Sequence, residues 1–212
     1  MLFRSLTFPQ LFVEWRRLAE QQTSDFRERL TAALAVEWPA RVVSEGTGER
    51  IVLGRPSKGD RIPGIWINGT RPAALVVHPD GAEAARKDPA VARLVQAGRA
   101  VLLIDAFQTA SAVAPRDLSV KMFLTFNKTD DAERVQDIAT ALAWLKQPKT
   151  QLIGLGKAAV WTTFAAAVSP VSVDLQADLP TFHGTDEEFA RDFFVPGIQR
   201  AGGLRAAREL LK

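Results

Sequence analysis

The sequence predicts a three-layer α/β fold with a mostly parallel sheet, on three observations. Near-continuous apolar segments such as Ala73–His78 and Ala100–Asp105 alternate with segments of helical periodicity. Strands that are apolar along both faces belong to sheets covered by helices on both sides. A chain of 212 residues with 47% hydrophobic residues can also bury one sizeable core. We expect an α/β domain over 40–212, preceded by a helical arm over 1–39.

The arm is predicted from apolar residues at helical spacing across residues 8–34. These residues are Phe8, Leu11, Phe12, Trp15, Leu18, Phe26, Leu30 and Leu34. Thr7 and Gln10 can form a capping box with Pro9 in the first turn, and Trp38-Pro39 should end the helix. The pattern predicts one long amphipathic helix, which must pack against something.

The remaining elements follow from caps, turns and apolar runs. Asp88 is a candidate N-cap followed by proline, Asp130 with Glu133 a candidate capping box, and Thr185 with Glu188 another. The expected strands are Arg50–Leu53, Ile62–Ile67, Ala73–His78, Ala100–Asp105, Gln151–Leu155 and Val171–Leu175. The expected helices run from 88 to 98, from 130 to 145, from 157 to 168, from 185 onward and from 203 to 212.

Polar residues follow the expected parallel strands at their carboxyl ends. They are His78, Asp80, Gly81, Asp105, Gly154, Gly156, Lys157 and Asp174. In open α/β sheets, ligands bind beyond this edge. The sequence therefore predicts that a ligand site, if the chain has one, lies here.

Composition argues against several classes of function. The net charge is only +3 and the basic residues are scattered, so nucleic-acid binding has little support. The chain has no cysteine and two histidines, so we expect neither thiolate chemistry nor a metal site. No apolar run reaches the roughly 18 residues that a membrane-spanning helix needs. We expect no cofactor.

The stretch "LIGLGKAAVW" leads from a strand into a helix through a glycine corner. In α/β-hydrolases such a corner reads G-x-S-x-G and carries the nucleophilic serine, whose place Gly156 takes here. Gly154, Gly156 and Ala159 also satisfy the dinucleotide pattern G-x-G-x-x-A, with Asp174 as the ribose-binding acid. Glycines can equally serve a tight turn alone. The corner by itself leaves these three interpretations open.

Other stretches carry a resemblance to a known family. These are "RPAALVVHPDGAEAARKDPAVARLVQAGRAVLLIDAFQT", "FLTFNKTDDAERVQDIATALAWL" and "FFVPGIQRAGGLRAA". Together with the corner, they resemble the bacterial acetylxylan-esterase-like proteins of the α/β-hydrolase superfamily. The likeness covers nearly the whole chain from about Trp15 onward. More narrowly, it is to the degenerate second hydrolase domain of tandem members.

The resemblance implies an α/β-hydrolase-like fold, reduced at the C-terminus and without catalytic residues. Gly156 replaces the serine, and no later segment brings the family's acid and histidine. We expect a non-catalytic domain with a structural, partner-docking or ligand-binding role. His78, Asp80, Gly81, Gly154, Gly156 and Lys157 would form its vestigial site, which could bind a carboxylate or other anion weakly. The alternatives are a carboxylic-ester hydrolase acting on carbohydrate, with an unconventional nucleophile or a completing partner domain, and, more remotely, a nucleotide-binding domain.

Further polar residues receive structural interpretations. Ser111 and Ser119, in the long loop near this edge, are candidate substitute nucleophiles but are expected to be ordinary surface residues, and His183 is expected in a turn. Arg134 and Asp137, near the start of a helix, are expected to form an ion pair or anchor a loop. The aromatic residues Phe123, Trp144, Trp161 and Phe164 are expected in the core.

The expected partners follow from the same resemblance. They are an upstream esterase domain or a second copy of this chain, with acetylated polysaccharide as a further candidate. Residues 1–5 could be non-native, because Leu2-Phe3-Arg4-Ser5 is the peptide that read-through of a common sequencing adapter would encode. The compartment is undecided, and export as part of a longer bacterial precursor stays open.

Overall fold

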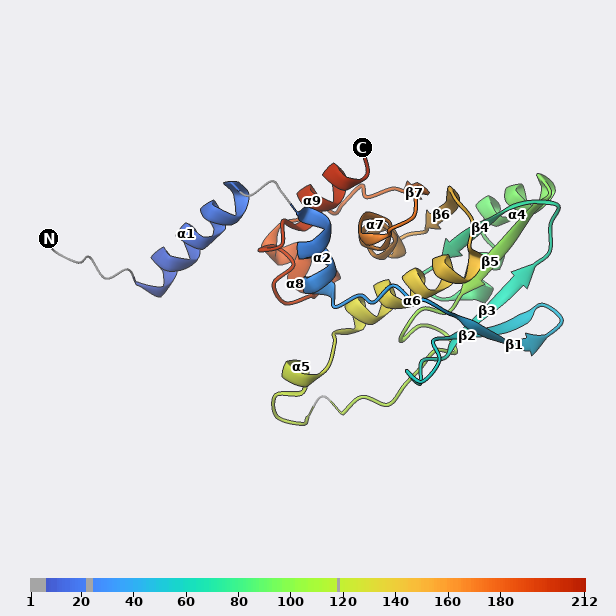
Figure 1. Cartoon of the computed structure of the whole chain (residues 1–212), viewed down its shortest axis with the longest axis horizontal. Coiled ribbons are helices and arrows are strands. Elements are labelled where there is room, and N and C mark those ends of the chain that lie inside the picture. Colours follow the sequence, from blue (N-terminus) through green and yellow to red (C-terminus); the bar gives the residue numbers. More distant parts are fainter. Residues whose placement is uncertain (1–6, 22–24, 118) are drawn as a thin grey trace, which may run out of the picture.

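The computed structural model describes residues 7–21, 25–117 and 119–212, and Figure 1 shows helices gathered around a central sheet. Within these residues, the seven-stranded sheet has the order β1-β2-β3-β5-β4-β6-β7. The strands are β1 (Val43–Thr47), β2 (Arg50–Gly54), β3 (Ile62–Ile67), β4 (Arg71–Val77), β5 (Arg99–Ile104), β6 (Thr150–Gly154) and β7 (Val173–Ala177). The helices are α1 (Phe8–Gln21), α2 (Phe26–Leu34), α3 (Ala82–Arg86), α4 (Pro89–Gln96), α5 (Phe123–Phe126), α6 (Asp130–Leu145), α7 (Ala158–Val168), α8 (Asp186–Asp192) and α9 (Gly203–Leu210).

The sheet is mixed. The pairs β1–β2, β2–β3 and β3–β5 are antiparallel, whereas β4–β5, β4–β6 and β6–β7 are parallel. The expectation of a mostly parallel sheet is therefore too strong. The reason is that short connections join β1 to β2 and β2 to β3, and parallel neighbours need a crossover of about a dozen residues or more.

The central strand β4 is buried on both faces. Its residues Ala73, Leu75 and Val77 belong to the larger core cluster, and the alternate residues Ala74 and Val76 belong to the smaller one. The larger cluster includes residues of α2, α6, α7, α8 and α9, and the smaller includes residues of α3 and α4. The predicted covering of the sheet by helices on both sides is confirmed.

Several helix ends follow their local sequence signals. The Asp88 carboxylate accepts the Ala90 N–H at 2.7 Å, with Pro89 as the first residue of α4. Thr185 and Glu188 form both halves of the capping box at α8. The predicted bounds of α6 are confirmed, but the predicted capping box of Asp130 and Glu133 is wrong: Thr129 is the N-cap and accepts the Ala132 N–H at 3.3 Å.

The predicted single helix over 8–34 is wrong, because the structure has two helices there. Asp25, directly before α2, has φ 62°, which a right-handed helix cannot contain. α2 ends at Leu34 with Ala35 in the left-handed region, before the predicted stop at Trp38-Pro39. At the start of α1, the Thr7 N–H donates to Gln10 Oε1 at 3.0 Å, which is one half of the predicted capping box. The interpretation of residues 1–5 lies outside the described residues.

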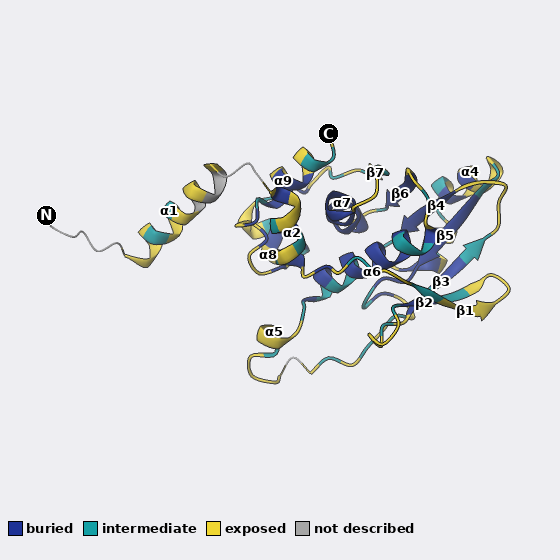
Figure 2. Ribbon diagram, viewed as in Figure 1, coloured by how far each residue is buried: buried dark blue, intermediate teal, exposed yellow. Residues whose placement is uncertain are grey.

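The two N-terminal helices have different surroundings. α2 buries Phe26, Leu30 and Leu34 in the larger core cluster and packs against α9 and α7. α1 lies apart from the sheet and is largely exposed, as Figure 2 shows. The structure therefore separates the predicted arm into a helix of the core and a projecting helix.

Gln136 on α6 links the sheet-covering helices to the segment after α2. Its side chain is fully buried, and its amide accepts the Glu37 N–H and donates to the Glu37 C=O, both at 2.9 Å. This pair of bonds satisfies the backbone polar groups of one residue in an irregular segment, where no ladder can do so.

We predict that Gln136→Ala lowers the free energy of unfolding by about 1–3 kcal/mol, because it leaves both Glu37 backbone groups without their partner. Urea denaturation would measure the loss. Gln176→Ala, at an exposed position of β7, is the control and should change stability little. Equal stability of the two variants would contradict the assigned role of Gln136.

Candidate functional site

The candidate site lies at the carboxyl ends of β4 and β6. Along the chain, β4 is followed by β5 on one side of it, and β6 then pairs with β4 on the other side. The direction of strand order reverses at this place, and such a switch point opens a crevice at the carboxyl ends of parallel strands. The β4–α3 loop and the glycine corner after β6 both reach this point, as the sequence predicted.

The glycine corner is shaped by packing and by backbone conformation. A Cβ atom on Gly154 would lie 2.1 Å from Thr162 Oγ1 and 2.7 Å from the Ala159 Cα, so only glycine allows α7 to lie this close to β6. Gly156 has φ +52°, and its Cβ direction is open, with the ring of Pro79 at 3.7 Å. A small side chain at 156 would therefore meet ordinary contacts but a strained backbone.

The β4–α3 loop approaches the corner through Pro79, and its backbone donors are used internally. The Asp80 N–H donates to His78 Nδ1 and the Gly81 N–H donates to the His78 C=O, both at 3.0 Å. The Nδ1 contact leaves Nε2 as the protonated nitrogen of a neutral His78 ring. Pro79 has no N–H. Residues 79–81 therefore direct no free backbone donor at the corner.

Asp105 is a structural anchor at this edge. Its carboxylate accepts the Ala82 N–H at 2.6 Å and the Ser111 N–H at 3.1 Å, and the Ser111 hydroxyl donates to it as well. Gly81 is required beside it, because a Cβ there would lie 2.5 Å from Asp105 Oδ1. Asp105 therefore caps backbone amides of the two loops next to it.

Lys157 and Asp80 are exposed at the rim. Lys157 Nζ lies 3.9 Å from Asp192 Oδ1, so its side chain points toward the end of α8. Asp192 also accepts a 2.6 Å contact from Arg191, and the hydrogen bond from Arg191 holds the pKa of Asp192 below its usual range. This carboxylate competes with any anion that Lys157 would attract at the corner.

Asp174 was expected at the carboxyl edge, and this is wrong. It lies near the start of β7, exposed, and pairs with Gln151 at the start of β6. The strand begins two residues later than predicted. Asp174 therefore lies at the amino end of β7, whereas Gly154 lies at the carboxyl end of the neighbouring strand β6. The ribose contact of a dinucleotide site cannot come from this residue.

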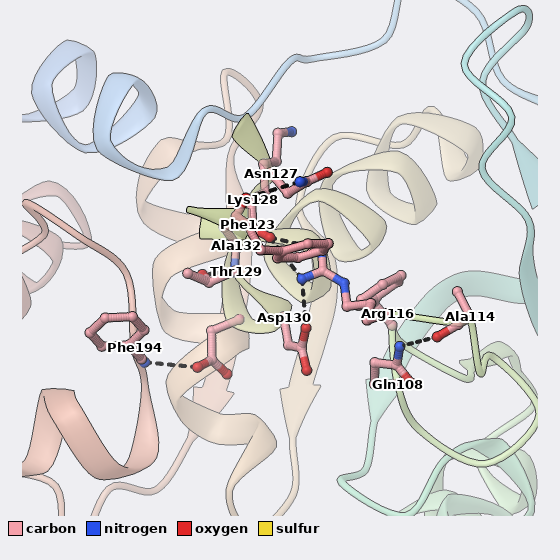
Figure 3. A network of polar contacts seen from close by, with 12 residues as sticks. Gln108, Ala114, Arg116, Phe123, Asn127, Lys128, Thr129, Asp130, Ala132 and Phe194 are labelled. Carbon is pink, nitrogen blue, oxygen red and sulfur yellow. Dashed lines mark hydrogen bonds and ion pairs between the residues drawn. The ribbon is translucent and has the colours of Figure 1, made fainter. Parts of the chain in front are cut away.

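The loop over 106–129 is held by Arg116, as Figure 3 shows. Its guanidinium lies between the rings of Phe107 and Phe123, 4.9 and 5.2 Å from their centres. It donates to the Lys128 C=O at 2.9 and 2.7 Å and contacts Asp130 at 3.0 Å. Phe123 is thus a partly exposed ring over a cation and lies outside the two buried clusters, contrary to the core placement expected for it.

Two buried carboxylates on α6 anchor neighbouring loops. Asp131 contacts Arg134 at 2.8 Å and accepts the Phe194 N–H at 2.8 Å. Burial raises the pKa of Asp131, and the Arg134 charge opposes that shift. Arg134 also donates to the Phe107 C=O at 2.9 Å and stacks 4.6 Å from the centre of the Trp161 ring.

Asp137 is the more strongly perturbed of the two. It accepts the Phe107 N–H at 2.8 Å, and it is buried. Burial and the nearby Glu133 raise the pKa of Asp137 well above its usual range; Asp60 acts in the same direction and Arg55 opposes it. The expectation that Arg134 and Asp137 anchor a loop is confirmed, whereas no local pattern predicts that Asp131 binds the Phe194 N–H beside them.

The substitute nucleophiles are paired with carboxylates and not with a histidine. The Ser111 hydroxyl donates to Asp105 and the Ser119 hydroxyl to Asp117. His183 lies in the loop before α8, as expected, and its N–H donates to Glu188 Oε2 at 2.9 Å. Among the described residues, no group of three or more His, Asp or Glu side chains could hold a metal.

A larger cavity, which the sequence did not indicate, lies away from the corner. It measures about 970 Å³ and is lined by residues of α1, the loop before α8, α8, α9 and the segment between α8 and α9, including Trp15, His183, Phe194 and Arg205. The lining residues of α1 are more than 160 residues away from the others in the sequence, so no local pattern joins the two groups.

None of the helices among the described residues has both the length and the apolar character that a membrane-spanning helix needs.

No family model matches this chain, and a search of curated proteins finds no match either. The likeness to acetylxylan-esterase-like proteins therefore stays a prediction, which rests on the stretches quoted above.

We predict that Asp137→Asn stabilises the protein increasingly as pH rises. The raised pKa means that the folded state holds a proton that the unfolded state releases above about pH 4. Folding stability from this group is therefore full below that pH and is lost as pH rises toward the folded pKa. Asparagine keeps an acceptor for the Phe107 N–H and removes the titration.

Urea denaturation across pH, comparing Asp137→Asn with the wild type, would measure this effect. Asp117→Asn is the contrasting control, because the hydrogen bonds from Ser119 lower the pKa of Asp117 and that variant should lose stability as pH rises. A difference between Asp137→Asn and the wild type that does not change with pH would contradict the prediction.

Proposed function

We propose that this chain is a non-catalytic α/β-hydrolase-like domain of an acetylxylan-esterase-type protein, and that its role is to dock a partner. The fold supports the proposal in its coarse features. A strand–corner–helix unit lies at the switch point of the sheet, and the loop after the neighbouring strand β4 approaches the same corner. In α/β-hydrolases that loop supplies an oxyanion donor and the corner supplies the nucleophile.

The groups present at the glycine corner support the proposal that the domain is non-catalytic. Acyl transfer needs a nucleophile, a base within hydrogen-bond reach and donors for the oxyanion. Here Gly156 offers no hydroxyl, Pro79 offers no N–H, and the amides of the next two residues bond to His78. The hydroxyls of Ser111 and Ser119 donate to carboxylates rather than to a histidine. Of the groups that a hydrolase elbow uses, the corner therefore lacks the nucleophile and the donor from the β4–α3 loop, and has only the backbone N–H of Lys157, the residue after the nucleophile position.

The exposed helix α1 supports the proposal that the domain docks a partner. Phe8, Phe12 and Trp15 are 78%, 56% and 42% exposed. A large apolar stripe on an amphipathic helix favours burial against another surface. A carboxylic-ester hydrolase completed by a partner domain is the second candidate, since the corner would then lie next to groups from that partner. The nucleotide-binding alternative loses its support with the position of Asp174 at the amino end of β7.

We predict that the chain hydrolyses chromogenic acetyl esters no faster than buffer, and that Gly156→Ser leaves the rate near background. A serine at 156 would still lack a general base, worth roughly 10²–10⁴-fold, and an oxyanion donor, worth roughly 10²–10³-fold. Circular dichroism would confirm that the variant folds, because the left-handed backbone at 156 costs a side chain about 1–2 kcal/mol.

Ser111→Ala and Ser119→Ala are the matched controls for this assay. Turnover by the wild-type chain that disappears in one of these variants would identify a displaced nucleophile and establish the hydrolase alternative. Turnover that survives both variants would equally defeat the non-catalytic proposal.

A further inference from the structure

Helix α1 presents one apolar stripe to solvent. Phe8, Leu11, Phe12, Trp15 and Leu18 recur at helical spacing on one side of α1, and Leu18 is 45% exposed. Val13, 70% exposed, lies on the opposite side, because successive residues are about 100° apart around a helix. Figure 2 shows α1 projecting from the other described elements, with most of its described residues exposed.

Hollow space lies on both sides of Trp15, at the base of α1. The cavity of about 970 Å³ is bounded by Phe12 and Trp15 on one side and by Phe194 and Arg205 on the other. A second cavity of about 540 Å³ is bounded by Trp15, Leu18, Ala32, Ala33 and Ala201. Trp15 contacts the body of the molecule through Arg200, whose guanidinium lies 5.4 Å from its ring centre. The chain's own α1 therefore forms a wall of these cavities without filling them.

The shape of the smaller cavity suits a helix like α1. Its lining includes the small residues Ala32, Ala33 and Ala201, which allow a helix to approach closely. Arg29 and Arg200 also line it, and on α1 Glu14 pairs with Arg17 at 2.6 Å, so the match is one of shape and not of net charge. Each copy of the chain thus offers both the apolar helix and a hollow that would receive one.

We propose that two copies of this chain pair through α1. The apolar stripe of each α1 enters the smaller cavity beside α1 of the other copy. The inference rests on the proposed docking role of α1 and names its partner. The hollows lie at the base of α1 and Phe8 lies at its free tip, so the two arms run antiparallel about a two-fold axis. Such an interface is closed, because the same patch is used on both sides. Both α1 helices and both smaller cavities are covered at once. Stable interfaces typically bury roughly 1,600 Å² in total, which is about 800 Å² from each copy.

The first test measures mass by sedimentation equilibrium over a range of concentrations. The wild-type chain should be a dimer, and Phe12→Glu should shift it to a monomer with an unchanged circular dichroism spectrum. Val13→Glu is the matched control on the opposite side of the same helix and should remain a dimer. A monomeric wild type, a dimeric Phe12→Glu variant, or equal loss of dimer in both variants would overturn the proposal.

The second test uses the absence of cysteine from the chain. Phe8→Cys and Leu18→Cys each introduce a single thiol at the two ends of the stripe, about 15 Å apart along the helix axis. Under mild oxidation, a mixture of the two variants should form a disulfide between position 8 of one chain and position 18 of the other. This disulfide should form faster than either variant alone forms a disulfide-linked homodimer. Faster homodimer formation by Phe8→Cys would overturn the antiparallel pairing.

These outcomes are separate from the ester assay. A monomeric chain without esterase activity would overturn the second copy as partner and leave the non-catalytic assignment standing. A dimeric chain with esterase activity would overturn the non-catalytic assignment and leave the second copy standing as the partner.

Discussion

The need to bury β4 on both faces governs the rest of this structure. Alternate side chains of β4 enter different core clusters, so the strand is stable only between two layers of helices. Its neighbours β5 and β6 run parallel to it, and parallel neighbours must be joined by crossover connections. Helices α3 and α4 cover one face, and α6 and α7 cover the other. The connections on both sides of β4 then bring their loops to its carboxyl end.

The corner at that end is explained by packing alone. Gly154 allows α7 to approach β6, and Gly156 turns the chain in a left-handed conformation between them. The carboxylates of Asp105, Asp131 and Asp137 each accept a hydrogen bond from a backbone amide of the surrounding loops. A corner whose loops are anchored, and whose neighbouring loop has its Asp80 and Gly81 amides bonded to His78, is organised for rigidity. This rigidity supports the proposed docking role, which we place elsewhere on the surface.

The N-terminal region shows where that surface lies. α2 completes the core beside α7 and α9, whereas the same run of apolar spacing continues into α1 without a covering layer. Burying apolar area is the dominant favourable term both in folding and in association. The exposed stripe next to two hollows is therefore the surface that we propose another chain covers, and Trp15 borders both hollows.

The sequence by itself determined the features that depend on neighbouring residues. These include the apolar strands, the caps at Asp88 and Thr185, and the glycine corner with Gly154 and Gly156, since each needs only contacts a few residues apart. Tertiary structure alone decided the break at Asp25, the antiparallel half of the sheet, the placement of Asp174 at the amino end of β7, and the meeting of Asp131 with Phe194. Helical periodicity continues across a break, and strand register and loop anchors depend on partners tens of residues away. Those contacts form only when the chain has packed around β4.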